Sequence, residues 1–251
     1  MTKSLLKIYP LGHLSLGLVE LVLLAWAIRL WRRSTSLAMI VLPIVLASIS
    51  YDNLVLAMGS LIGEGDLLKS LSMVRFLLHF LVVPLFIVIA VELAHRAGAV
   101  WAKTIVRVLS WVLALGLGGY EVATHFVGLE LVPVTFAGTL RYTVAEVSGP
   151  PIVTILVNLF VLLIGIGIWV RLKWPWLFVG TLVALIGNAV PISRFGTLVG
   201  SASEFVMALS LLLTERRTQF VRAQLGSGEK TMKVESWVEG RMLKVEGWVE
   251  G

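Results

Sequence analysis

Three ionisable residues within apolar stretches form the chemical centre that this sequence predicts. Asp52 lies in SISYDNLVLAM, while Arg75 and His79 are four residues apart and so share one face of a helix. An ionisable group inside a membrane span costs at least about 2.5–3.5 kcal/mol, which makes such residues functional candidates. We predict that Asp52 and His79 are the catalytic pair. Arg75 either neutralises Asp52 or binds an anionic headgroup.

Other polar side chains are predicted at a similar depth, towards the same side of the bilayer. Every predicted span contributes at least one of them, which indicates a polar cavity that opens to that side. The other half of the bundle has little comparable apart from Glu92. The predicted cavity-lining residues are Glu20, Tyr51, Asn53, Glu121, His125, Asn158, Asn188 and Glu204.

A metal site is one interpretation of this set. Asp52, His79, Glu121 and His125 offer the mixed nitrogen and oxygen ligands of a zinc-type centre, whose bound water would be acidic. The chain has no HExxH motif, and a Glu-x-x-x-His pair is common by chance. A divalent cofactor such as zinc is therefore one alternative, and a structural network of hydrogen bonds and ion pairs is the other.

Long apolar blocks must position these residues, because the composition departs from that of soluble domains. The chain is 58% hydrophobic and 14% charged, with a mean hydropathy of +0.93, whereas soluble domains are about 45–50% apolar and about 25% charged. We predict an all-α integral membrane protein, a single bundle of seven transmembrane helices. The predicted spans are Leu11–Trp31, Ser36–Ile62, Leu67–His95, Lys103–Thr124, Pro151–Arg171, Pro175–Ile192 and Gly196–Thr214.

The distribution of Lys and Arg predicts the orientation of the bundle. These residues concentrate in the first, third and fifth connections and in the tail, for example at Arg32, Arg96, Arg171 and Arg216. By the positive-inside rule the N-terminus lies outside and the C-terminus in the cytoplasm, within the cytoplasmic (plasma) membrane. The net charge of +6 is thus distributed over span ends, which argues against nucleic-acid binding. The chain has no cysteine, so thiolate sites and disulfides are excluded.

Two segments lie outside the predicted spans. Residues 1–218 form the predicted transmembrane domain, and 219–251 form a polar tail that contains KVESWVEG and KVEGWVEG, eleven residues apart. The Gly/Ser break in LGSGEK and the alternation of valine, tryptophan and glutamate predict a flexible segment or weak hairpin. The loop Thr124–Pro150, which carries Arg141, Tyr142 and Glu146, is either a lid over the cavity or an ordinary surface loop.

The stretch SISYDNLVLAM followed by RFLLHF resembles the bacterial lysoplasmalogenase-like membrane proteins. Both place an acidic residue in an early span with a histidine downstream. Tyr51–Asp52 stands where that family has Gly-Asp, and the predicted number of spans differs, so the resemblance does not assign the chain to the family. It implies lipid chemistry.

Taken together, these residues predict an intramembrane enzyme that acts on a lipid or amphiphile by hydrolytic or acid–base chemistry. The alternatives are a transporter or sensor that binds a small cationic or amphiphilic ligand in the same cavity, and a non-catalytic assembly protein. Membrane lipids are the predicted partners. A retinal cofactor is excluded, because the last predicted span, Gly196–Thr214, has no lysine for a Schiff base.

Overall fold

Long apolar helices make up most of the computed structural model, which describes residues 5–34, 36–145 and 151–249. Within these residues, six helical segments are long and apolar enough to cross a membrane, and a seventh apolar helix is shorter. This confirms an all-α protein with six to seven long apolar helices. The six are α1 (Leu5–Arg33), η1 (Leu37–Ile40) with α2 (Val41–Ile62), α3 (Asp66–Val82) with η2 (Val83–Leu85) and α4 (Phe86–Arg96), α5 (Thr104–Glu121) with the π-helical turn η3 (Val122–Phe126), α6 (Ile152–Leu172) and α9 (Leu198–Val249).

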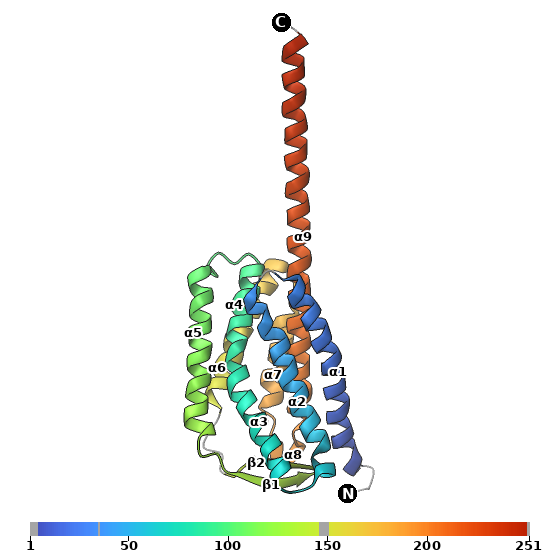
Figure 1. Ribbon diagram of the computed structural model, residues 1–251, viewed down its shortest axis with the longest axis vertical. Coiled ribbons are helices and arrows are strands. Elements are labelled where there is room, and N and C mark those ends of the chain that lie inside the picture. Colours follow the sequence, from blue (N-terminus) through green and yellow to red (C-terminus); the bar gives the residue numbers. More distant parts are fainter. Residues whose placement is uncertain (1–4, 35, 146–150, 250–251) are drawn as a thin grey trace.

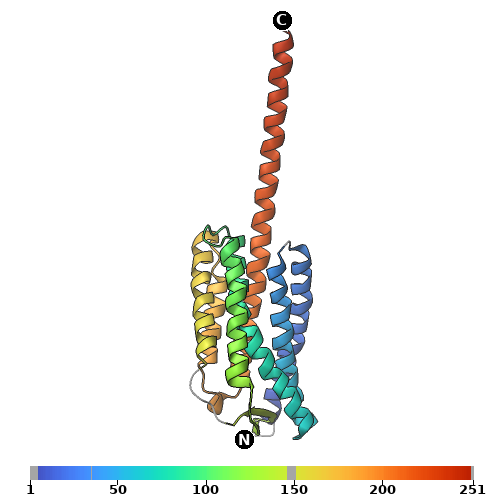
Figure 2. The same cartoon turned by 60° about the vertical axis from the view of Figure 1, so that its left-hand side comes forward.

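The apolar helices run side by side as one bundle (Figures 1 and 2). A β-hairpin and the start of α1 lie at one end, which we call the hairpin end, and α9 leaves the bundle at the other, the tail end. Large apolar side chains cover the outside, with Val22, Leu115 and Leu163 each more than 60% exposed. An apolar surface of this extent is typical of a protein in contact with lipid.

Two of the apolar segments are interrupted within the bundle. Pro84 has no N–H to donate and its ring clashes with the preceding turn, so the helix breaks at η2 between α3 and α4. α7 (Trp176–Asn188) stops after 13 residues. Irregular chain and the short helix α8 (Ile192–Phe195) then connect it to α9.

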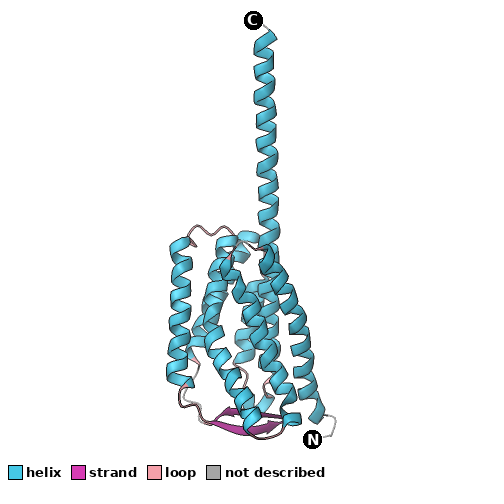
Figure 3. Ribbon diagram, in the orientation of Figure 1, coloured by secondary structure: helices cyan, strands magenta, loops and turns pink. Residues whose placement is uncertain are grey.

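The segment between α5 and α6 contains the hairpin, formed by β1 (Leu131–Phe136) and β2 (Thr139–Val144) and lying across the end of the bundle (Figure 3). Ala137 and Gly138 both have positive φ, as a two-residue hairpin turn requires. The sequence predicted either a lid over the cavity or an ordinary surface loop here, and neither alternative included a β-sheet. Glu146 lies outside the described residues.

The hairpin is docked on α2 by direct backbone contact. Ser60 Oγ donates to the carbonyl of Gly138 at 2.5 Å and accepts from the N–H of Leu140 at 2.9 Å. A Cβ atom at Gly59 would lie 1.9 Å from the carbonyl oxygen of Leu140. Beside the same turn, the ring of Phe136 packs edge-on against Tyr9 of α1 at 5.2 Å between centroids. The hairpin therefore spans from α2 to α1.

We expect Gly59→Ala to lower the free energy of unfolding by about 1–3 kcal/mol, because the added methyl group must displace the hairpin backbone. Thermal unfolding in detergent measures this. Gly116→Ala is the matched control, since a Cβ there meets nothing within 4 Å in the described structure. It should be neutral or stabilising by up to about 1 kcal/mol, because alanine is the better helix former. Equal effects of the two substitutions would show that the hairpin is not docked on α2.

The tail differs from the sequence expectation. Where a flexible break and a hairpin are predicted within 219–251, α9 continues as a helix to Val249 and extends beyond the bundle (Figure 1). The tandem copies are eleven residues apart, which is close to three helical turns, so they repeat along a helix as readily as along a strand. Lysine, glutamate, arginine, methionine and leucine, which are good helix formers, make up much of the segment.

Candidate functional site

A cavity of about 250 Å³ lies at the hairpin end, and we call it the chamber. It is enclosed by α2, α3, β2, the end of α7, the connection through α8 and the start of α9. Most of its side chains are polar or charged. Its lining residues are Ser48, Ile49, Asp52, Arg75, Phe76, His79, Arg141, Thr143, Gly187, Asn188, Val190, Ile192, Gly196, Thr197, Gly200, Ser201 and Glu204.

The predicted residues Asp52, Arg75 and His79 all lie in the chamber wall, although they are not all bonded to one another. Arg75 Nε donates to Asp52 Oδ1 at 2.7 Å, which confirms the expected ion pair. The Arg75 side chain is 9% exposed and that of Asp52 is 31% exposed. His79 is exposed and has no hydrogen bond or ion pair with the residues that the structure describes. Asp52 is therefore held by Arg75, and His79 is available to an occupant.

Behind the chamber wall, a buried chain of hydrogen bonds joins α1, α2 and α9. Asn53 Nδ2 donates to the Glu20 carboxylate at 3.1 and 3.0 Å, and Asn53 Oδ1 lies 2.8 Å from His13 Nδ1. His13 Nε2 lies 3.0 Å from Thr197 Oγ1. Because the amide oxygen can only accept, His13 carries its proton on Nδ1, and in a neutral ring Nε2 accepts from Thr197. We call Glu20, Asn53, His13 and Thr197 the buried chain.

Arg141 and Glu204 are the two charged lining residues outside the Asp52–Arg75 pair. Strand alternation places Tyr142 in an apolar cluster with Val55 and Leu68, and leaves Arg141 to line the chamber. Burial lowers the pKa of the Arg141 guanidinium, an effect that Arg75 increases and Asp52 opposes. The group nevertheless stays cationic, as arginine does in proteins.

A smaller pocket of about 40 Å³ adjoins the chamber on the side of the tail end. It shares His79, Asn188 and Glu204 with the chamber. Its other walls are mainly apolar, and they come from the Pro84 break and from α2, α6 and α9: Val45, Val82, Val83, Phe86 and Met207, with Thr154 and Asn158. The cavity thus has a polar part beneath the hairpin and a narrow apolar part deeper in the bundle.

The structure brings together part of the predicted site. Asp52, Arg75, His79, Asn188 and Glu204 line the chamber. Asn158 lines only the apolar pocket, and Glu20 and Asn53 belong to the buried chain. Tyr51 donates from its hydroxyl to the carbonyl of Leu71 at 3.1 Å and packs in the cluster under the hairpin, outside the chamber.

The metal interpretation is not supported by this arrangement. Glu121 and His125 lie 3.7 Å apart on α5 and η3, and neither lines the chamber or the apolar pocket. Among the described residues, no three His, Cys, Asp or Glu side chains form a group that could hold a metal ion. Helical spacing placed Glu121 and His125 beside each other but gave no information on which neighbour α5 faces.

Sequence reasoning missed several residues of the site. His13 is buried and lies seven residues before Glu20, on the same side of α1. This helical spacing alone could have indicated that the two side chains face the same neighbours. Arg141 and Thr143 reach the chamber because the loop folds into a hairpin. Thr197 and Ser201 lie near the start of α9, where their small polar side chains gave no distinctive pattern.

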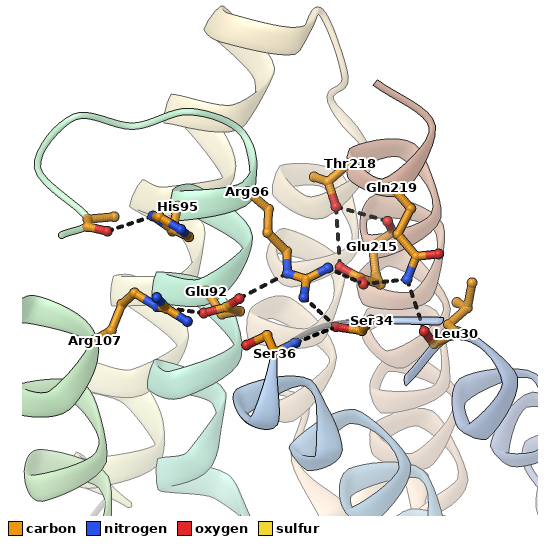
Figure 4. Close-up of polar contacts among 11 residues, drawn as sticks. Leu30, Ser34, Ser36, Glu92, His95, Arg96, Arg107, Glu215, Thr218 and Gln219 are labelled. Atoms are coloured by element: carbon orange, nitrogen blue, oxygen red, sulfur yellow. Dashed lines mark hydrogen bonds and ion pairs between the residues drawn. The ribbon is translucent and has the colours of Figure 1, made fainter. Parts of the chain in front are cut away.

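A second polar cluster, at the tail end, corrects the expectation that this half of the bundle has little beyond Glu92 (Figure 4). Arg96 donates from Nε to Glu92 at 3.0 Å, from Nη1 to Glu215 at 2.8 Å, and from Nη2 to Ser34. Arg107 Nε also donates to Glu92, at 2.8 Å. The predicted last span ended at Thr214, which put Glu215 outside the membrane, whereas α9 carries it into this tail-end network.

Comparison with known proteins finds no family model that matches the chain and no curated protein with a matching sequence.

Proposed function

We propose that this chain is a membrane sensor of seven spans, which binds a small amphiphilic ligand in the chamber and transmits the binding through α9. The hairpin end would face outside and the tail the cytoplasm. Arg32, Arg33, Arg96, Lys103 and Arg171 support this orientation, because they lie at the tail end of their helices or in the connections there.

The irregular chain between α7 and α9 is the observation that best supports a ligand-binding chamber. α7 has 13 residues, which at about 1.5 Å each give a helix shorter than the roughly 30 Å hydrocarbon core. Non-helical backbone at membrane depth is tolerated where it is buried in protein or lines a polar cavity. Val190, Ile192, Gly196 and Thr197 of this segment all line the chamber.

The shape of the cavity favours an amphiphile. Charged and hydroxyl side chains surround the part beneath the hairpin, and the deeper pocket is lined by Val82, Val83, Phe86 and Met207. A ligand with a polar group and a short apolar group would place each in matching surroundings. The deeper pocket holds about 40 Å³, which limits the apolar group to a few carbon atoms.

The continuity of α9 favours a sensor over a transporter. One helix lines the chamber at Ser201 and Glu204, carries Glu215 in the tail-end network, and continues to Val249. A shift of α9 on ligand binding would therefore reach the tail without a break in the helix. Transporters that alternate access are typically built from repeated halves with paired broken helices.

The proposal is tested by the ligand that the protein retains on purification. We expect mass spectrometry to detect a small molecule in the wild-type protein and Thr143→Trp to lose at least about 90% of it, because the indole would fill the chamber. Thr135→Trp is the matched control, since Thr135 is an exposed residue on the same hairpin. Absence of a retained molecule, or equal retention by both variants, would refute ligand binding in the chamber.

An intramembrane enzyme acting on a lipid or amphiphile is the second candidate, and the exposed imidazole of His79 favours it. Asp52 is bonded to Arg75 and makes no hydrogen bond with His79 in the described structure, so the bound molecule would have to supply the second proton-transfer partner. If His79→Gln retained the ligand but chemical products disappeared from the membrane lipids and metabolites, the enzyme would be favoured over the sensor.

A further inference from the structure

The charges of the chamber are not all neutralised within the protein. Asp52 and Arg75 form an ion pair at 2.7 Å. Arg141 and Glu204 line the same cavity, and neither side chain makes a hydrogen bond or ion pair with another described residue. The chamber therefore presents one unpaired guanidinium and one unpaired carboxyl group to whatever occupies it.

These two charges lie at different levels of the cavity. Arg141 belongs to the hairpin, lines the chamber and does not reach the deeper pocket. Glu204 lies six residues along α9 from Leu198, about 9 Å at a rise of 1.5 Å per residue, and lines both cavities. The guanidinium is thus at the roof of the chamber and the carboxyl group at its floor.

Arg75 adds a further donor at this site. Its side chain is only 9% exposed, and Nη1 is buried without a hydrogen-bond partner among the described residues. A buried donor without a partner costs about 1–3 kcal/mol, so an anionic group that accepts from Arg75 would recover part of that free energy. An unpaired carboxyl group in a low-dielectric cavity favours its neutral form, and a cationic group bound beside Glu204 would stabilise the ionised form.

We infer that the ligand is a small zwitterion, with its cationic group against Glu204 and its anionic group against Arg141 and Arg75. The inference depends on the chamber being a ligand site, as proposed above. Neither a simple cation nor a simple anion would neutralise both ends of the cavity. Thr143, Thr197 and Ser201 line the space between and supply hydroxyl groups for the rest of the molecule. The zwitterion is either a free solute or the headgroup of a lipid that enters from the bilayer.

Calorimetry on the full-length protein in a maltoside detergent, after removal of retained ligand, tests the inference. The zwitterionic probes are glycine betaine, leucine and dihexanoylphosphatidylcholine, and the half-molecules are choline and acetate. We expect at least one zwitterion to bind at least about tenfold more tightly than either half-molecule, which corresponds to about 1.4 kcal/mol. Tighter binding of the phosphatidylcholine would identify a lipid source, and tighter binding of betaine or leucine a free solute.

Charge-removing variants provide the second part of the test. Glu204→Gln and Arg141→Gln should each weaken binding of that zwitterion at least about tenfold, because each removes one of the two complementary charges. Glu130→Gln and Arg194→Gln are the matched controls, since both residues are exposed in the same part of the chain and line neither cavity. These controls should bind as the wild type does.

Three results would overturn the inference. They are binding of choline or acetate as tight as that of the zwitterions, charge variants indistinguishable from their controls, and no binding of any zwitterion. The proposed function is tested separately from the charge of the ligand. If Thr143→Trp still loses the molecule that the wild-type protein retains, the chamber binds a ligand of another charge type and only the zwitterion is refuted.

Discussion

Arg96→Leu should lower the free energy of unfolding by about 3–5 kcal/mol, because it leaves two buried carboxylates without their shared cation. Arg96, Glu92 and Glu215 have side chains 2% exposed or less. Arg107 would remain to neutralise Glu92, but it is 33% exposed and does not contact Glu215. Thr218 and Gln219 would still donate to Glu215, at 3.2 and 2.7 Å, without supplying positive charge. Unfolding of the purified protein in mixed detergent micelles measures the loss.

A triple substitution separates loss of charge balance from loss of packing. Glu92→Leu, Arg96→Leu and Glu215→Leu together remove the charges, and replacement of a buried ion network by apolar residues is often neutral or stabilising. We therefore expect the triple variant to recover most of the stability that Arg96→Leu loses. Arg32→Leu, at an exposed position of the same end, is the control and should change stability by less than about 0.5 kcal/mol. If the triple variant were less stable than Arg96→Leu, the carboxylates would not be the cause.

The apolar pattern predicted the helices well because the bilayer imposes a strong constraint on it. A span must be long and apolar, and Ser36–Ile62 and Leu67–His95 were predicted to within a few residues of the observed segments. The pattern misplaced the ends of the last two helices in opposite directions. α7 ends at Asn188, before the predicted Ile192, whereas α9 continues far beyond the predicted Thr214. Hydropathy marks where a chain enters lipid, but it does not mark where a helix ends.

The site was predicted in part because depth can be estimated from sequence and direction cannot. Asp52, Arg75 and His79 lie at one level across a single hairpin of helices, and local spacing was enough to place them together. Glu121 and His125 lie at a comparable level, but α5 turns them away from the chamber. Which way a span faces depends on contacts between helices that are distant in sequence, and no local pattern records them.

The tail-end network also depends on a contact between residues that are distant in sequence. Arg96 and Glu92 are four residues apart, so their contact could be expected, but Glu215 is 119 residues away from Arg96. Its position required the packing of α9 against α4. Arg96 bonds to residues of three segments, namely α4, the connection after α1, and α9. For a sensor in which α9 transmits ligand binding, a displacement of α9 would strain the ion pair between Glu215 and Arg96.

Asn53→Leu is expected to lower the free energy of unfolding by about 2–5 kcal/mol, because the buried chain depends on this one amide. Its Nδ2 group donates to Glu20 and its oxygen accepts from His13, and both partners are 0% exposed. Leucine would leave the Glu20 carboxylate and the His13 Nδ1–H without their partners, each at a cost of about 1–3 kcal/mol. Asn53→Asp should be similarly destabilising, because it places a second carboxylate against Glu20. Unfolding in mixed micelles compares the variants.

Asn158→Leu is the matched control, because Asn158 is also a buried asparagine but its amide bonds within its own helix. Asn158 is 6% exposed, but its Nδ2 group donates to the carbonyl of Thr154 one turn earlier in its own helix, at 2.9 Å. That carbonyl keeps its backbone hydrogen bond when the amide is removed, so we expect a change below about 1 kcal/mol. Equal losses at the two positions would mean that burial alone sets the cost. A much larger loss at Asn53 would mean that α1, α2 and α9 are held together through its amide, beside the chamber that Thr197 lines.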